Sequence, residues 1–239
     1  MVNQVATIAL VPLLVVQGCY VRWRTPKLPE PPGPSVGAAG SGPSLRLLVA
    51  GDSAAAGVGV ASQSEALIGQ LVLRLQNSFR VDWRLEAEIG ATTRSTTARL
   101  AQLEVSGFDV MITSLGVNDI TGGVGTKTWL KSQRELRSFA RNRFGVTQLI
   151  IAGLPPVDGF PALPQPLRWY LGSRAKHLND ILEKELASEP SAHYLDLRFT
   201  LDPSLMASDG FHPGPVIYDG WARRAAELIF RACPVQIRH

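Results

Sequence analysis

The stretch LRLLVAGDS, residues 45–53, decides the fold that we predict for this chain. Its first six residues form a short apolar run that ends at Gly51, which is typical of a buried parallel strand. Two polar residues, Asp52 and Ser53, follow at once. Because ligands of open α/β sheets bind beyond the carboxyl ends of the strands, this segment predicts both a strand and the start of a functional site.

Helix and strand patterns alternate along the rest of the chain. Ser62 and Glu65 are spaced as a capping box, and apolar residues from Leu67 to Phe79 then recur with the period of a helix. Further strands are predicted at residues 81–89, 109–115, 148–152 and 194–197, and further helices at residues 93–103, 128–144, 167–186 and 215–231. This alternation predicts an α/β fold, a three-layer α/β/α sandwich with an approximately five-stranded parallel sheet.

The composition favours one catalytic domain. With 239 residues, 45% of them hydrophobic, the chain can bury one full core. Cys19 and Cys233 lie far apart and show no metal-binding spacing, so neither a metal nor a disulfide framework is expected. The net charge of +4 is mild, and nucleic acid is not an expected partner. A basic stripe recurs at helical spacing and is interpreted as a solvated helix face rather than as a contact with anionic lipid. The stripe comprises Lys127, Lys131, Arg134, Arg137 and Arg141.

Two segments precede that domain, which we expect at residues 45–239. Residues 1–25 hold a nearly uncharged apolar run followed by Arg22, Arg24 and Lys27. The run is short for a bilayer-spanning helix, so three interpretations compete: a retained membrane anchor, a cleaved signal peptide and a lipoprotein signal at Cys19. The retained anchor is preferred, and the side of the membrane stays open. Residues 26–44 are rich in Pro, Gly and Ser and predict an extended linker.

Ser53 has the sequence position of a nucleophile. A serine hydroxyl is weakly nucleophilic at its own pKa, so it has to lie at an exposed turn within reach of a base. The loop DGFHP, residues 209–213, precedes the last predicted helix and supplies Asp209 and His212. An imidazole can take and return the serine proton while a carboxylate orients it. Each motif alone is more typical of a turn or a helix cap, but their combination favours catalysis.

Two further motifs offer hydrogen-bond donors. Gly90, after the second predicted strand, would let the backbone approach a ligand and present its N–H. Asn118, in the motif GVND at residues 116–119, carries an amide donor that suits an oxyanion hole. Taken alone, the first is typical of a simple turn and the second of a helix start.

In chain order these motifs contribute Ser, Gly, Asn and His. With them the chain resembles the SGNH hydrolase superfamily, also called GDSL esterases and lipases. The resemblance extends from about residue 45 to residue 231. The family's first block is matched by residues 51–53, its second by Gly90, its third by residues 116–119, and its fifth by Asp209 and His212. Ala54 stands where the family commonly has Leu.

The resemblance implies a flavodoxin-like sheet and a serine-hydrolase mechanism without a cofactor. Ser53 would attack an ester carbonyl, His212 would act as base and then as acid, and Asp209 would orient His212. The oxyanion would be held by the backbone N–H groups of Ser53 and Gly90 and by the Asn118 amide. The G-x-S-x-G elbow of α/β-hydrolases is not expected, and none surrounds Ser53.

A Pro-rich segment at residues 154–172 predicts an apolar wall beside the site, carrying Phe160, Trp169 and Tyr170. We therefore expect an esterase for short- to medium-chain carboxylic esters, with lysophospholipids or thioesters in the same class. Deacetylation of a carbohydrate or cell-envelope polymer is the alternative within the enzyme class. The alternative from another class is a membrane-tethered binding module that has lost activity.

Overall fold

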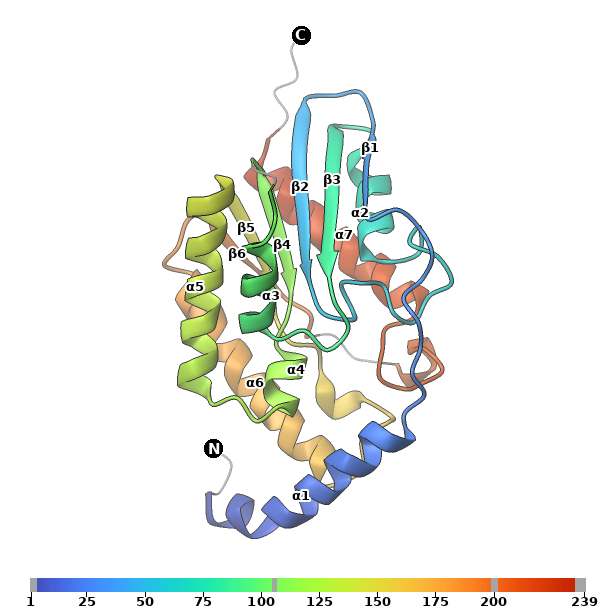
Figure 1. The fold of residues 1–239 in the computed structure, drawn as a ribbon, viewed down its shortest axis with the longest axis vertical. Coiled ribbons are helices and arrows are strands. Elements are labelled where there is room, and N and C mark those ends of the chain that lie inside the picture. Colours follow the sequence, from blue (N-terminus) through green and yellow to red (C-terminus); the bar gives the residue numbers. More distant parts are fainter. Residues whose placement is uncertain (1–3, 105–106, 199–201, 235–239) are drawn as a thin grey trace.

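A single mixed sheet organises the molecule (Figure 1). Within residues 4–104, 107–198 and 202–234, which the computed structural model describes, six strands pair in the order β1-β3-β2-β4-β5-β6. Only β1 is antiparallel to its neighbour, and the other pairs are parallel. The strands are β1 (Val36–Ala39), β2 (Ser44–Gly51), β3 (Arg80–Ala87), β4 (Val110–Ser114), β5 (Gln148–Ala152) and β6 (Ala192–Leu195).

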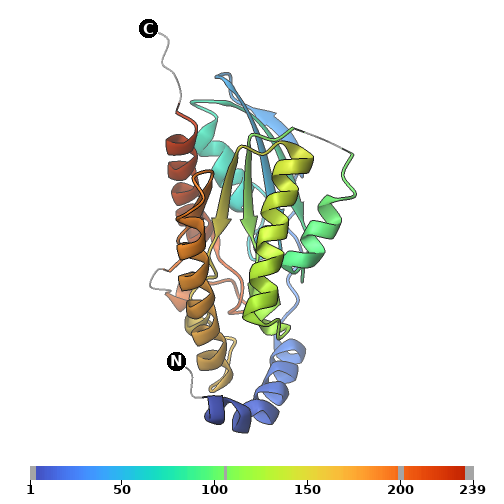
Figure 2. The same ribbon diagram turned by 90° about the vertical axis from the view of Figure 1, so that its left-hand side faces the viewer.

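Helices cover both faces of this sheet, as the two views show (Figures 1 and 2). The α-helices are α1 (Gln4–Arg24), α2 (Leu67–Leu75), α3 (Thr93–Leu100), α4 (Val117–Thr121), α5 (Thr126–Phe144), α6 (Leu167–Leu186) and α7 (Pro215–Ala232). Two short 3-10 helices, η1 (Val157–Gly159) and η2 (Pro203–Leu205), lie in the connections. The predicted three-layer α/β sandwich is confirmed.

Strand β2 shows why the sheet is buried on both faces. Leu47 and Val49 point into one apolar cluster, together with the inward faces of α2 and α7. Leu48 and Ala50 point into the other cluster, with α3, α5 and α6. Because successive side chains of a strand alternate between faces, a strand buried on both sides has to be apolar throughout, which is the pattern that the sequence shows.

Strand β1 is the clearest departure from the sequence prediction. The described residues form six strands where we predicted about five, and β1 falls inside the segment predicted as a linker, residues 26–44. Its residues are small and largely exposed, and Gly37 lies so close to the Trp83 ring that a Cβ would come within 2.6 Å of it. An exposed edge strand carries no apolar alternation, so the pattern could not reveal it.

The start of α2 also differs from the prediction. The predicted capping box between Ser62 and Glu65 does not form: the helix begins after Ala66 with no side-chain cap. The Ser62 hydroxyl instead pairs with Ser64, and the Glu65 carboxylate accepts a hydrogen bond from the Ala61 backbone N–H. These hydrogen bonds stabilise the turn that precedes the helix.

The basic stripe on α5 is mostly an intramolecular contact. Arg137 is 3% exposed and bonds to Glu185 and Glu189 at the end of α6, at 2.5 and 3.0 Å. Arg134 and Arg141 pair with the same two carboxylates. The interpretation as a solvated face is therefore wrong for the buried Arg137, whereas Arg134 is exposed and also forms an ion pair. The sequence period could not show that acidic residues at the end of α6 and just after it lie opposite.

Helix α1 lies across the end of the molecule toward which the parallel strands point (Figures 1 and 2). Leu14 is buried in the cluster that contains α6. The Gln17 side chain donates to the Gln165 carbonyl at 2.7 Å and accepts from the Leu167 backbone N–H at 3.0 Å. Among the residues that the structure describes, no helix is both long and apolar enough to cross a bilayer. The predicted membrane attachment stays a prediction at this point.

The order of the strands in the sheet determines where the candidate site lies. From β2 the chain passes to β3 on one side and then returns to β4 on the other, so the direction of winding reverses between β2 and β4. Ligands of open α/β sheets bind at such a switch point, outside the carboxyl ends of the two strands. Ser53 follows β2 and Asn118 follows β4, which brings both to this crevice.

Candidate active site

The turn after β2 brings Ser53 to the carboxyl edge of the sheet. The Asp52 backbone N–H donates to the Ser114 carbonyl of β4 at 3.1 Å, which holds the two strand ends together. Gly51 is required at this point, because a Cβ there would lie 2.4 Å from the same carbonyl oxygen. Among the described residues, the backbone N–H of Ser53 has no hydrogen-bond partner, so it is available to a ligand.

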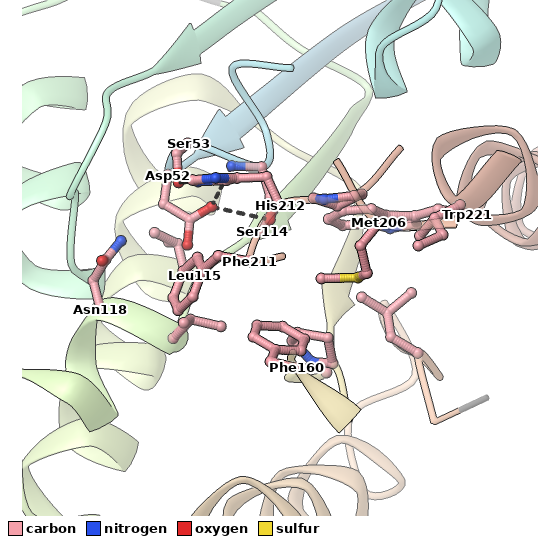
Figure 3. Close-up of a pocket in the computed structure, with 17 residues that line it drawn as sticks. Asp52, Ser53, Ser114, Leu115, Asn118, Phe160, Met206, Phe211, His212 and Trp221 are labelled. Atoms are coloured by element: carbon pink, nitrogen blue, oxygen red, sulfur yellow. Dashed lines mark hydrogen bonds between the residues drawn. The ribbon is translucent and has the colours of Figure 1, made fainter. Parts of the chain in front are cut away.

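The predicted Ser, His and Asp side chains form one hydrogen-bonded chain, of which Figure 3 shows Ser53 and His212. His212 Nε2 lies 2.9 Å from Ser53 Oγ, and His212 Nδ1 lies 2.5 Å from Asp209 Oδ2. The imidazole thus bridges a hydroxyl and a carboxylate, with its two nitrogens in different roles. This is the geometry that transfers a proton from a serine to an imidazole and stabilises the imidazolium.

The loop at residues 209–213 is locked by the same carboxylate. Asp209 Oδ1 accepts from the backbone N–H groups of Phe211 and His212, at 2.9 and 3.0 Å. Burial would raise the pKa of the Asp209 carboxyl, but the hydrogen bonds from His212 and Phe211 hold that pKa below its ordinary value. Asp209 is therefore ionised at neutral pH and fixes the orientation of the His212 ring.

Asp52, beside the nucleophile, is a second buried carboxylate. Its Oδ1 accepts from the Ala54 backbone N–H at 3.0 Å and lies 3.4 Å from the Ser114 hydroxyl. Burial raises the pKa of Asp52 to about 6, although these hydrogen bonds and the nearby His212 oppose the rise. Asp52 contributes no bond to His212, so it shapes the turn that carries Ser53.

The motif at residues 116–119 turns β4 into α4. Gly116 has a φ of 125°, which a residue with a side chain adopts only with strain. Asn118 lines the pocket and donates one amide hydrogen to the Ala91 carbonyl at 2.9 Å. Asp119 is buried and accepts from the Thr93 backbone N–H and hydroxyl, at 3.1 and 3.0 Å. The two side chains together tie β4 to the start of α3.

Gly90 lies next to this contact but outside the pocket lining. It is exposed, with a φ of 84° and open space where a Cβ would stand. Its chain neighbour Ala91 is the residue that accepts the hydrogen bond from Asn118. The structure therefore brings Ser53 and Asn118 to one pocket, and places Gly90 one residue from the partner of Asn118.

The pocket at this site is largely apolar. It encloses about 700 Å³ of empty space, its open mouth included. Figure 3 shows Asn118 and Leu115 on one side of it, and Met206 and Trp221 on the other. Of the aromatic residues predicted for the wall, Phe160 lines the pocket, whereas Trp169 is 41% exposed and, like Tyr170, is not among the lining residues.

Several lining residues were not predicted from the sequence. Met206 follows η2, Phe211 belongs to the loop of His212, and Trp221 lies on α7. Trp221 is stacked on Tyr218, whose hydroxyl donates to the Val58 carbonyl at 2.8 Å and ties α7 to the loop after Ser53. The period of α7 shows that this face is apolar, but not that part of it lines a pocket.

Comparisons with known proteins show which proteins this chain resembles. The model of the GDSL-like lipase/acylhydrolase family matches residues 49–219. A GDSL-like esterase of Mycobacterium tuberculosis is 29% identical over a 245-residue alignment that covers 92% of this chain and 75% of the relative.

Solved structures share the fold. A lipolytic protein of the G-D-S-L family from Veillonella parvula superposes with a TM-score of 0.64 at 18% identity, over 78% of this chain and 99% of that protein. A protein assigned as an arylesterase from Agrobacterium tumefaciens gives a TM-score of 0.62 at 20% identity, over 79% and 99% of the two chains. Because the family model spans most of the chain and includes the end of β2, the Ser53 turn and all of β4, the chain belongs to the GDSL-like lipase/acylhydrolase family of carboxylic-ester hydrolases.

Proposed function

We propose that this protein hydrolyses short- to medium-chain carboxylic esters with Ser53 as nucleophile, His212 as general base and acid, and Asp209 as the residue that orients His212. The observation that carries the proposal is the bridge made by the His212 imidazole, 2.9 Å from the Ser53 hydroxyl and 2.5 Å from the Asp209 carboxylate, at an apolar pocket. Lysophospholipids and thioesters offer the same acyl carbonyl and belong to the same substrate class.

The reaction proceeds in two acyl transfers. Ser53 Oγ attacks the carbonyl carbon while His212 Nε2 takes the hydroxyl proton, and the ionised Asp209 stabilises the imidazolium. The tetrahedral intermediate collapses, the ester C–O bond breaks, and His212 gives its proton to the departing alcohol. Water then attacks the acyl-serine with His212 again as base, which releases the carboxylic acid and restores the Ser53 hydroxyl.

The negative charge on the carbonyl oxygen needs donors that face the pocket. The Ser53 backbone N–H is free for this role among the described residues, and Asn118 retains a second amide hydrogen beyond the one bound to Ala91. Gly90 is the third donor of the proposal. It lies next to Ala91 but outside the pocket lining, so its N–H would have to turn inward when a substrate binds. Donors that are held in place before the reaction stabilise the intermediate without the cost of reorganisation.

The apolar lining favours an acyl chain over a bare acetyl group. Phe160, Met206 and Phe211 provide carbon surface close to His212, and burial of each further methylene of a substrate is worth about 0.8 kcal/mol. The alternative, a deacetylase for carbohydrate or cell-envelope esters, makes the opposite prediction: an acetyl ester would react best, and longer chains would gain nothing.

A series of p-nitrophenyl esters, from acetate to octanoate, tests both points. We expect kcat/KM of the wild type to rise from acetate to an intermediate chain, and Ser53→Ala to lower it by more than about 10⁴-fold on every ester. Ser138→Ala, an exposed serine of α5, is the matched control and should react as the wild type does.

Equal rates for the wild type and Ser53→Ala would contradict the proposal and favour a binding module without activity. A maximum at acetate, abolished by Ser53→Ala, would retain the mechanism and favour the deacetylase.

A further inference from the structure

Helix α1 differs from an ordinary surface helix, because it is apolar on its outer side as well as on its inner side. Surface helices turn apolar residues to the core and polar residues to water. In α1 the polar residue Gln17 faces the protein, where its side chain binds the backbone at Gln165 and Leu167. Val15 and Val16 face solvent and are 60% and 65% exposed. Leu14 packs inward beside Gln17, so α1 is held against the protein and its second apolar side stays outside.

The exposed face is continuous and uncharged along the middle of the helix. Residues 11–20 contain no Asp, Glu, Lys or Arg. Consecutive positions of a helix differ by 100°, so residues spaced three to four apart lie on one side. We call this surface the α1 outer face, and it comprises the exposed residues Val11, Val15, Val16, Cys19, Tyr20 and Trp23. A continuous apolar surface of this kind marks a contact with a partner or a membrane.

The carboxyl end of α1 adds aromatic rings and positive charge. Trp23 is 81% exposed and lies beside Tyr20, with ring centroids 6.4 Å apart. Arg22, Arg24 and Lys27 lie close to this pair in the sequence, and residues 1–29 contain no Asp or Glu. Trp and Tyr are enriched where a protein meets the headgroup layer of a membrane, and nearby cations are attracted to anionic lipid.

We propose that the α1 outer face docks on an anionic lipid surface, with α1 lying in the plane of that surface. Val15 and Val16 would enter the boundary between headgroups and acyl chains, Tyr20 and Trp23 would lie at headgroup level, and Arg22, Arg24 and Lys27 would meet the anions. The α1 outer face of a second copy would offer another apolar surface but no acidic residue for these cations, whereas an anionic bilayer supplies both.

The docked orientation places the active site toward the lipid. Helix α1 lies at the end of the molecule toward which the parallel strands point, and Ser53 is at the carboxyl end of β2 (Figures 1 and 2). Leu14 on the inner side of α1 packs in the same apolar cluster as Phe160 of the pocket wall. The lipid surface would therefore lie at the end of the molecule that holds the site. The docking itself requires no catalysis.

Co-sedimentation of the full chain with vesicles tests the proposal. Vesicles of phosphatidylcholine alone are compared with an equimolar mixture of phosphatidylcholine and phosphatidylglycerol, at low and high salt. We expect the wild type to bind the anionic vesicles, and the double variant Val15→Glu/Val16→Glu to bind at least about tenfold more weakly, because it buries charge at the acyl boundary. Arg22→Gln/Arg24→Gln should lose most of the preference for anionic over neutral vesicles, as should the wild type at high salt.

Leu73→Glu is the matched control, since Leu73 is an exposed apolar residue of α2, 55% accessible, away from α1. It should bind vesicles as the wild type does, and every variant should hydrolyse a water-soluble p-nitrophenyl ester at the wild-type rate, which shows that it is folded. Absence of wild-type binding to anionic vesicles, or equal binding by Val15→Glu/Val16→Glu, would overturn the proposal. If the wild type binds no vesicles but is a dimer by analytical ultracentrifugation, and the glutamate variant is a monomer, the outer face is an interface between two copies instead.

Discussion

At the scale of single residues, two aspartates near Ser53 look alike in the sequence but have different pKa values in the fold. Asp209 and Asp52 both lie near the nucleophile, yet their environments separate their protonation. Bonds from His212 and backbone N–H groups keep Asp209 ionised, whereas complete burial lifts the pKa of Asp52 to about 6. The sequence motif presents both as aspartates beside polar residues, and the hydrogen bonds that each buried carboxyl accepts in the fold distinguish them.

Asp52 should make stability depend on pH. Its pKa is about 6 in the fold and 3.8 in an unfolded chain, so the folded protein binds more protons between these values. The stability due to the protonated carboxyl is full below about pH 4 and is lost as the pH rises through 6, by about 3 kcal/mol. We expect the unfolding free energy of the wild type, relative to Asp52→Asn, to fall by this amount between pH 4 and pH 8 in urea titrations.

The control for this measurement is Asp82→Asn, at a partly exposed position of β3. Its stability relative to the wild type should change far less over the same pH range. A pH-independent difference between the wild type and Asp52→Asn would show that Asp52 does not titrate in this window.

Asn118 should act in catalysis rather than in substrate binding. Removal of one oxyanion donor typically lowers kcat by about 10²- to 10³-fold. We expect Asn118→Ala to show such a loss of kcat with little change in KM, measured with the preferred p-nitrophenyl ester. Asn142→Ala, at an exposed position of α5, should leave both constants unchanged. A rise of KM at unchanged kcat would place Asn118 in ground-state binding instead.

At the scale of elements, ion pairs join two helices that cover the same face of the sheet. Arg137 of α5 is buried and reaches both Glu185 and Glu189, while Arg134 is exposed and reaches Glu185 alone. Burial decides how much each pair contributes, because solvent screens an exposed charge and not a buried one.

This difference predicts unequal effects of the two arginines on stability. Arg137→Ala leaves two carboxylates without their buried partner and should lower the unfolding free energy by about 3 kcal/mol, measured by urea denaturation at pH 7. Arg134→Ala, its exposed neighbour, should have a much smaller effect. Similar losses for both variants would mean that the network acts through helix α5 itself rather than through the buried pair.

The bounds of an element can be predicted from the sequence where neighbouring residues set them, but not where contacts with distant segments do. Strand β5 and helix α6 have the predicted bounds, since their patterns depend on neighbouring residues alone. Strand β1 was not predicted, because its pairing with β3 is made by backbone groups and its side chains are too small and too exposed to leave a pattern. The missing cap of α2 has a related cause, since Ser62 and Glu65 find partners in the preceding turn.

At the scale of the whole molecule, the pocket is assembled from segments far apart in the chain. Phe160 precedes α6, Met206 follows η2, and Trp221 belongs to α7, yet all three line the same cavity as Ser53. The size of this cavity is therefore a property of how the layers pack, and a change of volume at any one of these positions should alter the choice of substrate.

Met206→Trp should shorten the preferred acyl chain. The larger ring fills part of the cavity beside Trp221, so longer esters lose contacts that an acetyl ester never makes. We expect the ratio of kcat/KM for octanoate over acetate to fall by about tenfold or more. Val216→Trp, at a position of α7 that is 59% exposed, is the control and should keep the wild-type ratio. An unchanged ratio for Met206→Trp would place the acyl chain elsewhere.

The sequence by itself determined the α/β alternation and the motifs that hold Ser53, Asn118, Asp209 and His212. It placed the first two after strands and the last two before the final helix. These features are local: a short run of residues specifies a buried strand, and the turn that follows specifies what stands at its end.

Only the tertiary structure decided which of these side chains meet, and at what distance. It brought His212 within hydrogen-bond distance of Ser53, left Gly90 outside the pocket and paired α5 with α6. It also buried Leu14 on one side of α1 and left the apolar residues on the other side exposed. The physical reason is that a periodic pattern tells which residues are apolar, whereas the packing of distant elements decides whether an apolar face meets another face, lines a cavity or remains exposed.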